Sequence, residues 1–208
     1  GTNPCSEIIL RPNQFCNLTE IVVRAGDTIN TLTRKIKVAT LLGTIQSTFT
    51  NFGYLRKVWQ DNTEEERLLG VSLTGIMDSE LLNGRETGLA KTLEKLKKVA
   101  VDCNKEYAEK FNINQSTAIT CVKPSGTVSQ LVDSASGIHA RHNPYYIRTV
   151  RGDNKDPLTE FMKSCGIPNE PDVMKTEHTT VFSFPMKAPS GSVCRTDMTA
   201  IEQLEIWK

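Results

Sequence analysis

Asn3-Pro4-Cys5-Ser6-Glu7 and Phe15-Cys16-Asn17-Leu18-Thr19-Glu20 are the two stretches from which the fold and the chemistry of this chain are best inferred. Alternate residues of an extended loop point the same way, so Asn3, Cys5 and Glu7 can converge on one ligand. They offer a hydrogen-bonding amide, a sulfur and a base. A second thiol nearby, in the later stretch, can hold further electrons. The pattern predicts thiol redox chemistry on a small polar substrate.

The composition is that of an ordinary globular protein. With 208 residues, the chain can bury a full core and form one or two domains. A formal net charge of +1 predicts no broad attraction to nucleic acid or to a membrane surface. No apolar run approaches the length of a membrane span, and no charged-then-apolar leader opens the chain. These features together favour a cytoplasmic protein.

The cysteine pattern argues against a disulfide scaffold or a zinc site. Six cysteines are too sparse for a scaffold in a chain of this length, and none lies in a Cys-x-x-Cys pair. Cys103, Cys121 and Cys165 lie in apolar or helical settings, which predicts that they fill the core. Cys194 follows Ser-Gly-Ser and is expected to be a loop thiol. No metal ligands are therefore predicted, and a reducing compartment fits this usage.

Predicted strands alternate with predicted helices along the chain, which favours an α/β fold with a largely parallel sheet. Residues 1–16 contain turn formers and no helical period, which indicates a loop. Strands are predicted over residues 18–23, 71–76, 118–122, 145–150 and 179–184. Helices are predicted over residues 31–52, 89–111 and 156–166, and from the capping box Thr199-x-x-Glu202 to the end of the chain.

A Ser/Gly-rich stretch, Pro124-Ser125-Gly126-Thr127-Val128-Ser129, follows one predicted strand and precedes a predicted short helix. Backbone amides around a glycine, with hydroxyls at a helix N-terminus, can cradle phosphate oxygens without a lysine. A simple turn with a hydroxyl N-cap explains the same spacing, because this is no Walker motif. On spacing alone the simpler interpretation is favoured. Lys123 is a further candidate to attract phosphate.

The combined spacing of Asn3, Cys5, Glu7 and Cys16 resembles the active-site finger loop of ribonucleotide reductases. The short gap between the two cysteines is most similar to the adenosylcobalamin-dependent (class II) ribonucleoside-triphosphate reductases. The resemblance covers nearly all of the chain but only part of the family, whose members are several times longer. Further similar stretches are Gly70-Val71-Ser72-Leu73-Thr74-Gly75, Lys123-Pro124-Ser125-Gly126-Thr127-Val128-Ser129, Pro144-Tyr145-Tyr146-Ile147-Arg148 and Phe184-Pro185-Met186-Lys187-Ala188-Pro189.

The resemblance implies a ten-stranded α/β barrel of the ribonucleotide reductase and pyruvate formate-lyase type, with the finger loop threaded through its centre. Residues 1–16 would be the finger loop, and residues 17–208 would be strands and helices from roughly the second half of the barrel. The whole chain would then be part of one catalytic domain. Half a barrel leaves open sheet edges, so we expect weak folding alone, or a need for the missing N-terminal part of the same enzyme.

The resemblance also implies a role for each residue of the finger loop. Cys5 would become the thiyl radical that takes the ribose 3′ hydrogen, and Glu7 would be the general base on the 3′ hydroxyl. Asn3 would hold the ribose hydroxyls. Cys16 would be one of two thiols that supply the reducing equivalents and end as a disulfide. Its partner would lie in upstream sequence that is not part of this chain.

The implied activity is reduction of ribonucleoside triphosphates to 2′-deoxyribonucleoside triphosphates for DNA synthesis. Its implied cofactor is adenosylcobalamin, and its implied reductant is a dithiol protein such as thioredoxin. Residues 124–129 would bind the substrate's phosphates. No direct binding of nucleic acid or membrane is implied, and the chain alone is expected to be inactive.

Two other interpretations stay open on the sequence. One is a segment of the large subunit of a metal-dependent ribonucleotide reductase, against which the short cysteine spacing argues. The other is a catalytically silent fragment that binds nucleotide phosphates. The pair Tyr145-Tyr146 is interpreted as packing rather than as a radical relay, and His139-x-x-His142 as a turn with exposed imidazoles.

Overall fold

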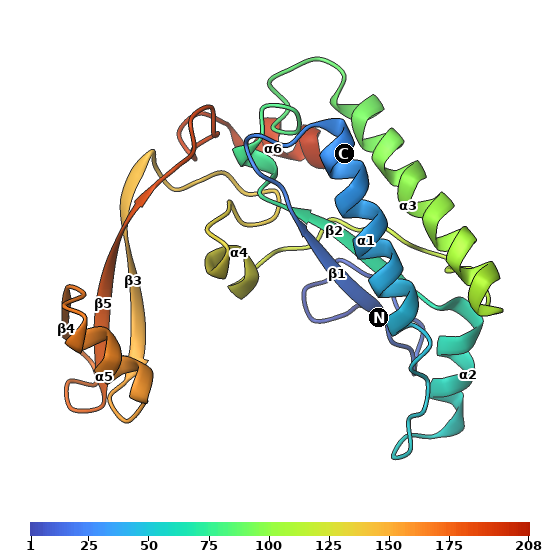
Figure 1. Cartoon of the computed structure of the whole chain (residues 1–208), viewed down its shortest axis with the longest axis horizontal. Coiled ribbons are helices and arrows are strands. Elements are labelled where there is room, and N and C mark those ends of the chain that lie inside the picture. Colours follow the sequence, from blue (N-terminus) through green and yellow to red (C-terminus); the bar gives the residue numbers. More distant parts are fainter. The chain divides into compact units, whose positions relative to one another are not determined.

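The computed structural model describes all 208 residues, and its chain divides into two compact units (Figure 1). The first unit contains residues 1–141 and 190–208, and the second contains residues 142–189. The first unit has β1 (Asn17–Val22), α1 (Ile29–Gln46), α2 (Lys57–Glu66), β2 (Leu69–Thr74), the 3₁₀ helix η1 (Ile76–Asp78), α3 (Leu89–Phe111), α4 (Thr127–Leu131) and α6 (Ala200–Trp207). The second has β3 (Tyr145–Asp153), α5 (Pro157–Ser164), β4 (Asn169–Pro171) and β5 (Thr179–Lys187).

The sheet of the first unit is parallel, as predicted. β1 and β2 pair in register from Asn17 opposite Leu69 to Val22 opposite Thr74. On the other side of β2, the predicted strand over residues 118–122 is reduced to a single parallel bridge. Its amide and carbonyl groups still pair with β2, because the Val71 amide donates to the carbonyl oxygen of residue 119 at 2.8 Å. The segment therefore acts as a short third strand.

Two long helices, α1 and α3, lie side by side, and α1 packs directly on β1 and β2 (Figure 1). Apolar residues at spacings of three and four build their buried stripes, which is why these segments form amphipathic helices. α1 begins at a reciprocal capping box between Thr28 and Thr31. The core residues that the two helices and the sheet share include Leu32, Ile36, Ala39, Leu96, Ala100, Ile21 and Val71.

The helix bounds agree with the sequence where local signals are strong and differ elsewhere. α3 has the bounds that its apolar period predicted. α1 was expected to reach residue 52 but ends at Gln46, where Ser47 caps it and accepts a hydrogen bond from Arg67 at 2.6 Å. α2 was not predicted, because its sequence is polar and has only one buried residue, Thr63.

The second unit corrects the expectation of a largely parallel sheet. Its strands lie in the order β3-β5-β4, and both pairs are antiparallel. Asp156 is the N-cap of α5, and its side chain accepts a hydrogen bond from the Leu158 amide. Gly166, with φ +73°, follows the end of the helix. The helix packs on β3 at Gly152, where an added Cβ would lie 2.4 Å from the Thr159 hydroxyl. The short β4 then lets the chain return beside β5 rather than cross over to a parallel position.

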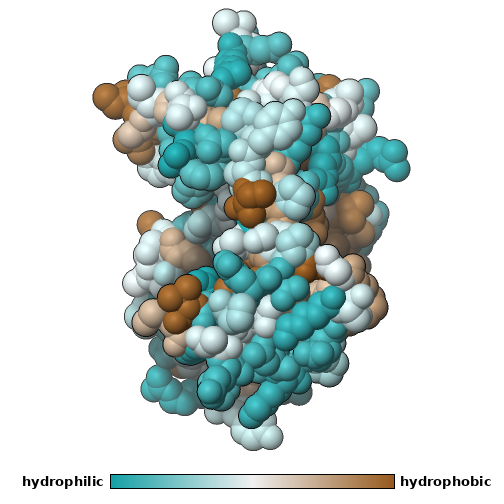
Figure 2. All heavy atoms as spheres, turned by 90° about the vertical axis from the view of Figure 1, so that its left-hand side faces the viewer, coloured by the Kyte–Doolittle hydropathy of each residue, from teal (hydrophilic) through white to brown (hydrophobic).

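The surface is mixed in character. Figure 2 shows the face that carries the β3–β5 pair, where polar residues cover most of the area and hydrophobic residues form separate spots. Single exposed hydrophobic residues are normal on soluble domains and indicate no binding site by themselves. No helix has the length and apolar character needed to cross a membrane.

Candidate functional site

The N-terminal loop folds back on itself in a tight turn. The amides of Asn3 and Ser6 donate to Ile8 and Asn3 carbonyl oxygens at 3.2 and 3.0 Å, and Ser6 has φ +64°. The Asn3 side-chain oxygen accepts from the Ile8 amide at 3.0 Å. The extended conformation expected for residues 3–7 is therefore replaced by a turn. Asn3 stabilises this turn through its backbone and its Oδ1, and its side-chain Nδ2 has no hydrogen-bond partner.

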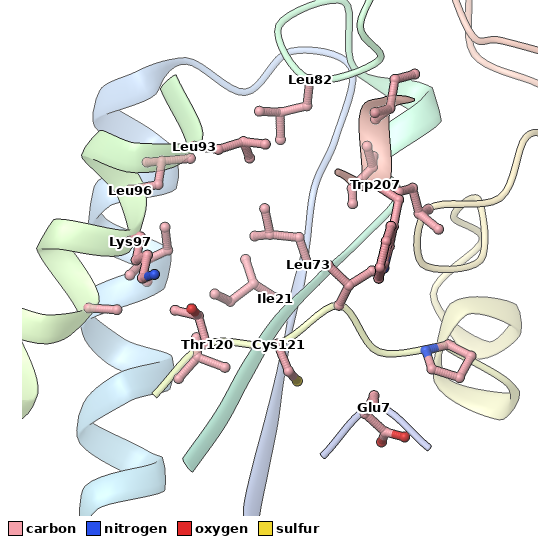
Figure 3. Close-up of a pocket in the computed structure, with 18 of the residues that line it drawn as sticks. Glu7, Ile21, Leu73, Leu82, Leu93, Leu96, Lys97, Thr120, Cys121 and Trp207 are labelled. Atoms are coloured by element: carbon pink, nitrogen blue, oxygen red, sulfur yellow. The ribbon is translucent and has the colours of Figure 1, made fainter. Parts of the chain in front are cut away.

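The turn places two of the predicted residues on one cavity. Cys5 and Glu7 line a cavity of about 820 Å³ that lies within the first unit (Figure 3). Pro124, from the Ser/Gly-rich loop, lines it too, whereas Asn3 and Cys16 are not among the lining residues. Most of the remaining wall is apolar and comes from the sheet and from helices α3 and α6, including Ile21, Leu73, Leu93, Leu96 and Trp207.

Glu7 is the polar group of this cavity that most clearly lacks a partner. Both of its carboxylate oxygens are buried without a hydrogen bond. A buried carboxylate without a partner is costly, so it indicates a ligand or proton acceptance at this place. Cys5 is an exposed free thiol beside it, open to a reactant from outside.

Cys16 lies immediately before β1 and is half-buried and free. Burial raises the pKa of the Cys16 thiol, and the negative charge of Glu7 raises it further. The two predicted cysteines therefore differ in environment: Cys5 lies on the cavity and is exposed, whereas Cys16 is shielded and stays protonated at neutral pH.

Cys121 is a cavity residue that sequence reasoning assigned to the core. Its side chain lines the cavity and is directed to the side on which Glu7 lies (Figure 3). Burial raises the pKa of Cys121 to about 12, with smaller contributions from the charges of Glu7 and Cys16. An added Cβ at Gly70 would lie 3.2 Å from the Cys121 sulfur, so the glycine makes room for this thiol. Its position two residues before Lys123-Pro124 was the only available sequence signal.

The loop over residues 124–129 divides into two parts. Ser125 and Ser129 are buried and bond to each other, because the Ser129 amide donates to the Ser125 hydroxyl at 3.2 Å. Gly126, Thr127 and Val128 are exposed at the start of α4, and no hydrogen bond within the chain engages the Thr127 hydroxyl. The predicted short helix is present, and the exposed part of the loop is free to meet a ligand.

No family model matches the chain. Among curated proteins, it is 33% identical to the adenosylcobalamin-dependent ribonucleoside-triphosphate reductase of Lactobacillus gasseri, over 92% of this chain and 28% of that protein. It is 29% identical to the reductase of the same name from Lactobacillus leichmannii, over 90% of this chain and 28% of that protein. The chain is similar to a segment of adenosylcobalamin-dependent ribonucleotide reductases. The resemblance predicted from the finger loop is confirmed.

A solved structure of a B12-dependent, class II ribonucleotide reductase has the same fold over this segment. The match has a TM-score of 0.75 at 29% identity and covers 92% of this chain and 30% of that chain. It supports the α/β fold class. The chain spans less than a third of the length of the reductases that it matches, so the activity of the whole enzyme is a matter for proposal.

Proposed function

We propose that this chain is part of the catalytic barrel of a class II ribonucleoside-triphosphate reductase, with residues 1–16 as the finger loop and residues 17–208 as strands and helices of about half the barrel. One observation carries the proposal. The free thiol of Cys5 and the unpartnered carboxylate of Glu7 line the same cavity. A thiol that can become a hydrogen-atom acceptor as its thiyl radical, and a carboxylate that can accept a proton, are what this radical chemistry requires at the ribose 3′ position.

In this proposal two side chains of the cavity wall have different chemical roles. Cys5, as a thiyl radical, removes the ribose 3′ hydrogen, and Glu7 accepts the 3′ hydroxyl proton. Adenosylcobalamin, when bound, supplies the one-electron chemistry that forms the radical. The exposed Cys5 thiol fits such a cofactor, because it can be reached from outside the chain. The apolar wall excludes water, which protects a radical from side reactions.

Cys16 supplies reducing equivalents in the same proposal. With a second thiol from another part of the enzyme it forms a disulfide as the ribonucleotide is reduced, and a dithiol protein such as thioredoxin reduces that disulfide. The raised pKa of Cys16 keeps it a thiol until then. All six cysteines are free, which fits a reducing, cytoplasmic setting.

The exposed part of the 124–129 loop is proposed to receive the triphosphate. Thr127 offers a hydroxyl without a partner, and Gly126 offers an unhindered backbone because nothing lies within 4 Å of an added Cβ. Pro124 joins this loop to the cavity that holds Cys5 and Glu7. The substrate's ribose would then lie in the cavity while its phosphates lie at the loop.

A reductase that carries this segment in place of the matching segment of the Lactobacillus gasseri relative tests the proposal. With adenosylcobalamin and a dithiol, it should convert a ribonucleoside triphosphate to the 2′-deoxy product. Cys5→Ser should abolish both product and exchange of the cofactor's hydrogen with solvent. Cys16→Ser should lose turnover but keep that exchange. Equal loss of both signals in the two variants would contradict the division of roles.

A further inference from the structure

The first unit contains a buried ion pair that is linked by hydrogen bonds to the loop at residues 124–129, called here the phosphate loop. Asp78, at the end of η1, and Arg141 are 2% and 4% exposed. The guanidinium donates from Nε and Nη2 to both carboxylate oxygens, each at 2.9 Å. Two charges out of water are stable only where geometry and further hydrogen bonds compensate for lost hydration. A bidentate pair of this kind also fixes the orientation of the guanidinium relative to the carboxylate, which a lysine cannot do.

Each member of the pair also forms hydrogen bonds with residues 133–135. The Asp78 carboxylate accepts from the Ala135 amide at 2.8 Å. Arg141 donates to the Asp133 carboxylate at 2.9 Å and to its carbonyl oxygen at 3.1 Å. Asp133 has φ +47°, a left-handed conformation that few residues other than glycine adopt. Such a backbone persists where its surroundings hold it, and here Arg24 adds a further bond to the same carbonyl oxygen at 2.9 Å.

The chain that leaves Asp133 then supports the phosphate loop. We call residues 133–141 the return segment. The Ser134 amide donates to the Ser129 carbonyl oxygen at 2.9 Å, and the Ser136 hydroxyl donates to the Ser125 carbonyl oxygen. Gly137, with φ +56°, approaches so closely that an added Cβ would lie 2.8 Å from the Lys123 carbonyl oxygen. Three successive contacts therefore join the return segment to the back of the loop.

We propose that Asp78 and Arg141 are positioning residues: they fix the return segment and, through it, the conformation of the loop at residues 124–129. Both side chains are 3% exposed and bond within the chain, so we assign them no contact with a ligand. The identity of the loop's ligand rests on the proposed function, but the mechanical link does not. Helix α4 is only five residues long and stabilises the loop little by itself. The buried pair therefore restricts the motion of the loop through the return segment.

Hydrogen exchange on the 208-residue chain tests this link. In Arg141→Lys, which keeps the charge but loses the bidentate pair, we expect exchange in a peptide covering residues 124–137 to become about tenfold faster, as in local opening. Exchange in α1 and in α3 should stay within a factor of about two, because the link is local. An equal acceleration in α1, α3 and the loop would show a role in overall stability only and would overturn the proposal.

Two further variants keep the test decisive. Arg24→Lys changes an exposed contact to Asp133 and leaves the buried pair intact, so we expect a smaller acceleration of loop exchange than in Arg141→Lys. An equal or larger acceleration in Arg24→Lys would overturn the proposal. Ser136→Ala removes one contact between the return segment and the loop without touching a buried charge, and we expect faster exchange of the Ser129 amide. If Arg141→Lys does not fold, unchanged loop exchange in Ser136→Ala overturns the proposal.

Binding of inorganic tripolyphosphate tests the phosphate role of the loop separately from the positioning role of Asp78 and Arg141. The affinity of tripolyphosphate for the wild-type chain and for Arg141→Lys is measured by titration calorimetry. Weaker binding together with faster loop exchange supports both proposals. No binding to either protein, with faster loop exchange in the variant, contradicts the phosphate role and leaves the positioning role standing. Equal binding and equal loop exchange would overturn the positioning role.

Discussion

Ser129 donates two hydrogen bonds to Ser125: its amide donates to the Ser125 hydroxyl, and its hydroxyl donates to the Ser125 carbonyl oxygen, each at 3.2 Å. Both serines are buried. Their hydrogen-bonding capacity is used inside the loop, so they shape the backbone and leave ligand contact to exposed neighbours. The sequence had grouped all the hydroxyls of this loop as phosphate ligands, and the structure separates them by burial.

This separation predicts opposite effects for two alanine variants. Thr127→Ala should weaken binding of a ribonucleoside triphosphate by about 1.5–3 kcal/mol, the range for a hydrogen bond to a charged group, with an unchanged melting temperature. Ser129→Ala should lower the free energy of unfolding by about 1–3 kcal/mol, because it leaves buried partners unpaired. Calorimetric titration and thermal melting of both variants decide. A stable Ser129→Ala with weak binding would reverse the assignment.

Features set by neighbouring residues could be predicted from the sequence. The capping box of Thr199 and Glu202 forms both of its bonds, and Asp156 caps α5, because each needs only residues within one turn. The bounds of α3 follow from an uninterrupted apolar period. The confirmed resemblance likewise rested on a short contiguous pattern around Cys5 and Cys16.

Features set by distant contacts could not be predicted. The apolar period of α1 continues to Phe49, but the helix ends where Arg67, twenty residues along the chain, bonds to Ser47. Residues 118–122 have the composition of a strand, yet their pairing depends on β2. The sequence predicts Cys121 to be a core residue, whereas the fold places it on the cavity that Glu7 also lines. The antiparallel order of the second sheet depends on how β4 returns, which no local pattern records.

Gly70 provides a test of how the sheet supports the N-terminal loop. An added Cβ there would lie 2.4 Å from a Leu18 methyl carbon and 3.3 Å from an Ile8 methyl carbon. Gly70→Ala should therefore lower the free energy of unfolding by about 1–3 kcal/mol through overpacking. Gly53→Ala is the matched control, because nothing lies within 4 Å of its added Cβ. Urea unfolding that shows equal stability for both variants would contradict this account.

The lowered pKa of Asp27 predicts that the stability of the chain falls in acid. Burial alone would raise the pKa of this carboxyl, but hydrogen bonds from Lys35, the Arg24 amide and the Thr31 hydroxyl outweigh it, so the pKa is lowered. A lowered pKa contributes stability above the ordinary value near 4, and this stability is lost as pH falls below it. Asp27→Asn should be less stable than wild type at pH 7, and the difference should shrink at pH 3. Circular dichroism melts at both pH values measure the difference.

Cys121 and Cys5 should differ in reactivity toward iodoacetamide. The thiolate is the reacting form, and burial raises the pKa of Cys121 to about 12. Cys5 is exposed and should be alkylated at pH 8, whereas Cys121 should stay unmodified until the pH is far higher or the chain is unfolded. Peptide mass spectrometry follows each site separately, and alkylation in denaturant provides the control. Equal rates at both sites in the folded chain would contradict the environment described for Cys121.

The same raised pKa makes stability fall with alkaline pH. Because the folded chain holds the Cys121 proton more tightly than the unfolded chain, stability is complete below the ordinary thiol value near 8.5 and declines as pH rises toward 12. Cys121→Ala should lose less stability than wild type between pH 8 and pH 10. Urea unfolding at the two pH values checks this, and an identical decline in both proteins would exclude the residue as its source.

Glu7→Gln should separate stability from function. The wild-type carboxylate is buried with neither oxygen bonded, so a neutral amide of the same shape should raise the free energy of unfolding by about 1 kcal/mol. Loss of its charge should also lower the pKa values of Cys16 and Cys121, since Glu7 raises both. Their alkylation should then begin at a lower pH than in wild type.

The functional cost should appear in the assembled reductase. Glutamine cannot accept the 3′ hydroxyl proton, so substrate affinity should change little while the rate of deoxyribonucleotide formation falls by about 10²-fold or more. Glu7→Asp is the matched variant, because it keeps the charge on a shorter side chain and should recover part of the rate. A stabilised Glu7→Gln with a wild-type rate and an unchanged pH profile would remove Glu7 from the chemistry. It would then be only a costly carboxylate on the cavity wall.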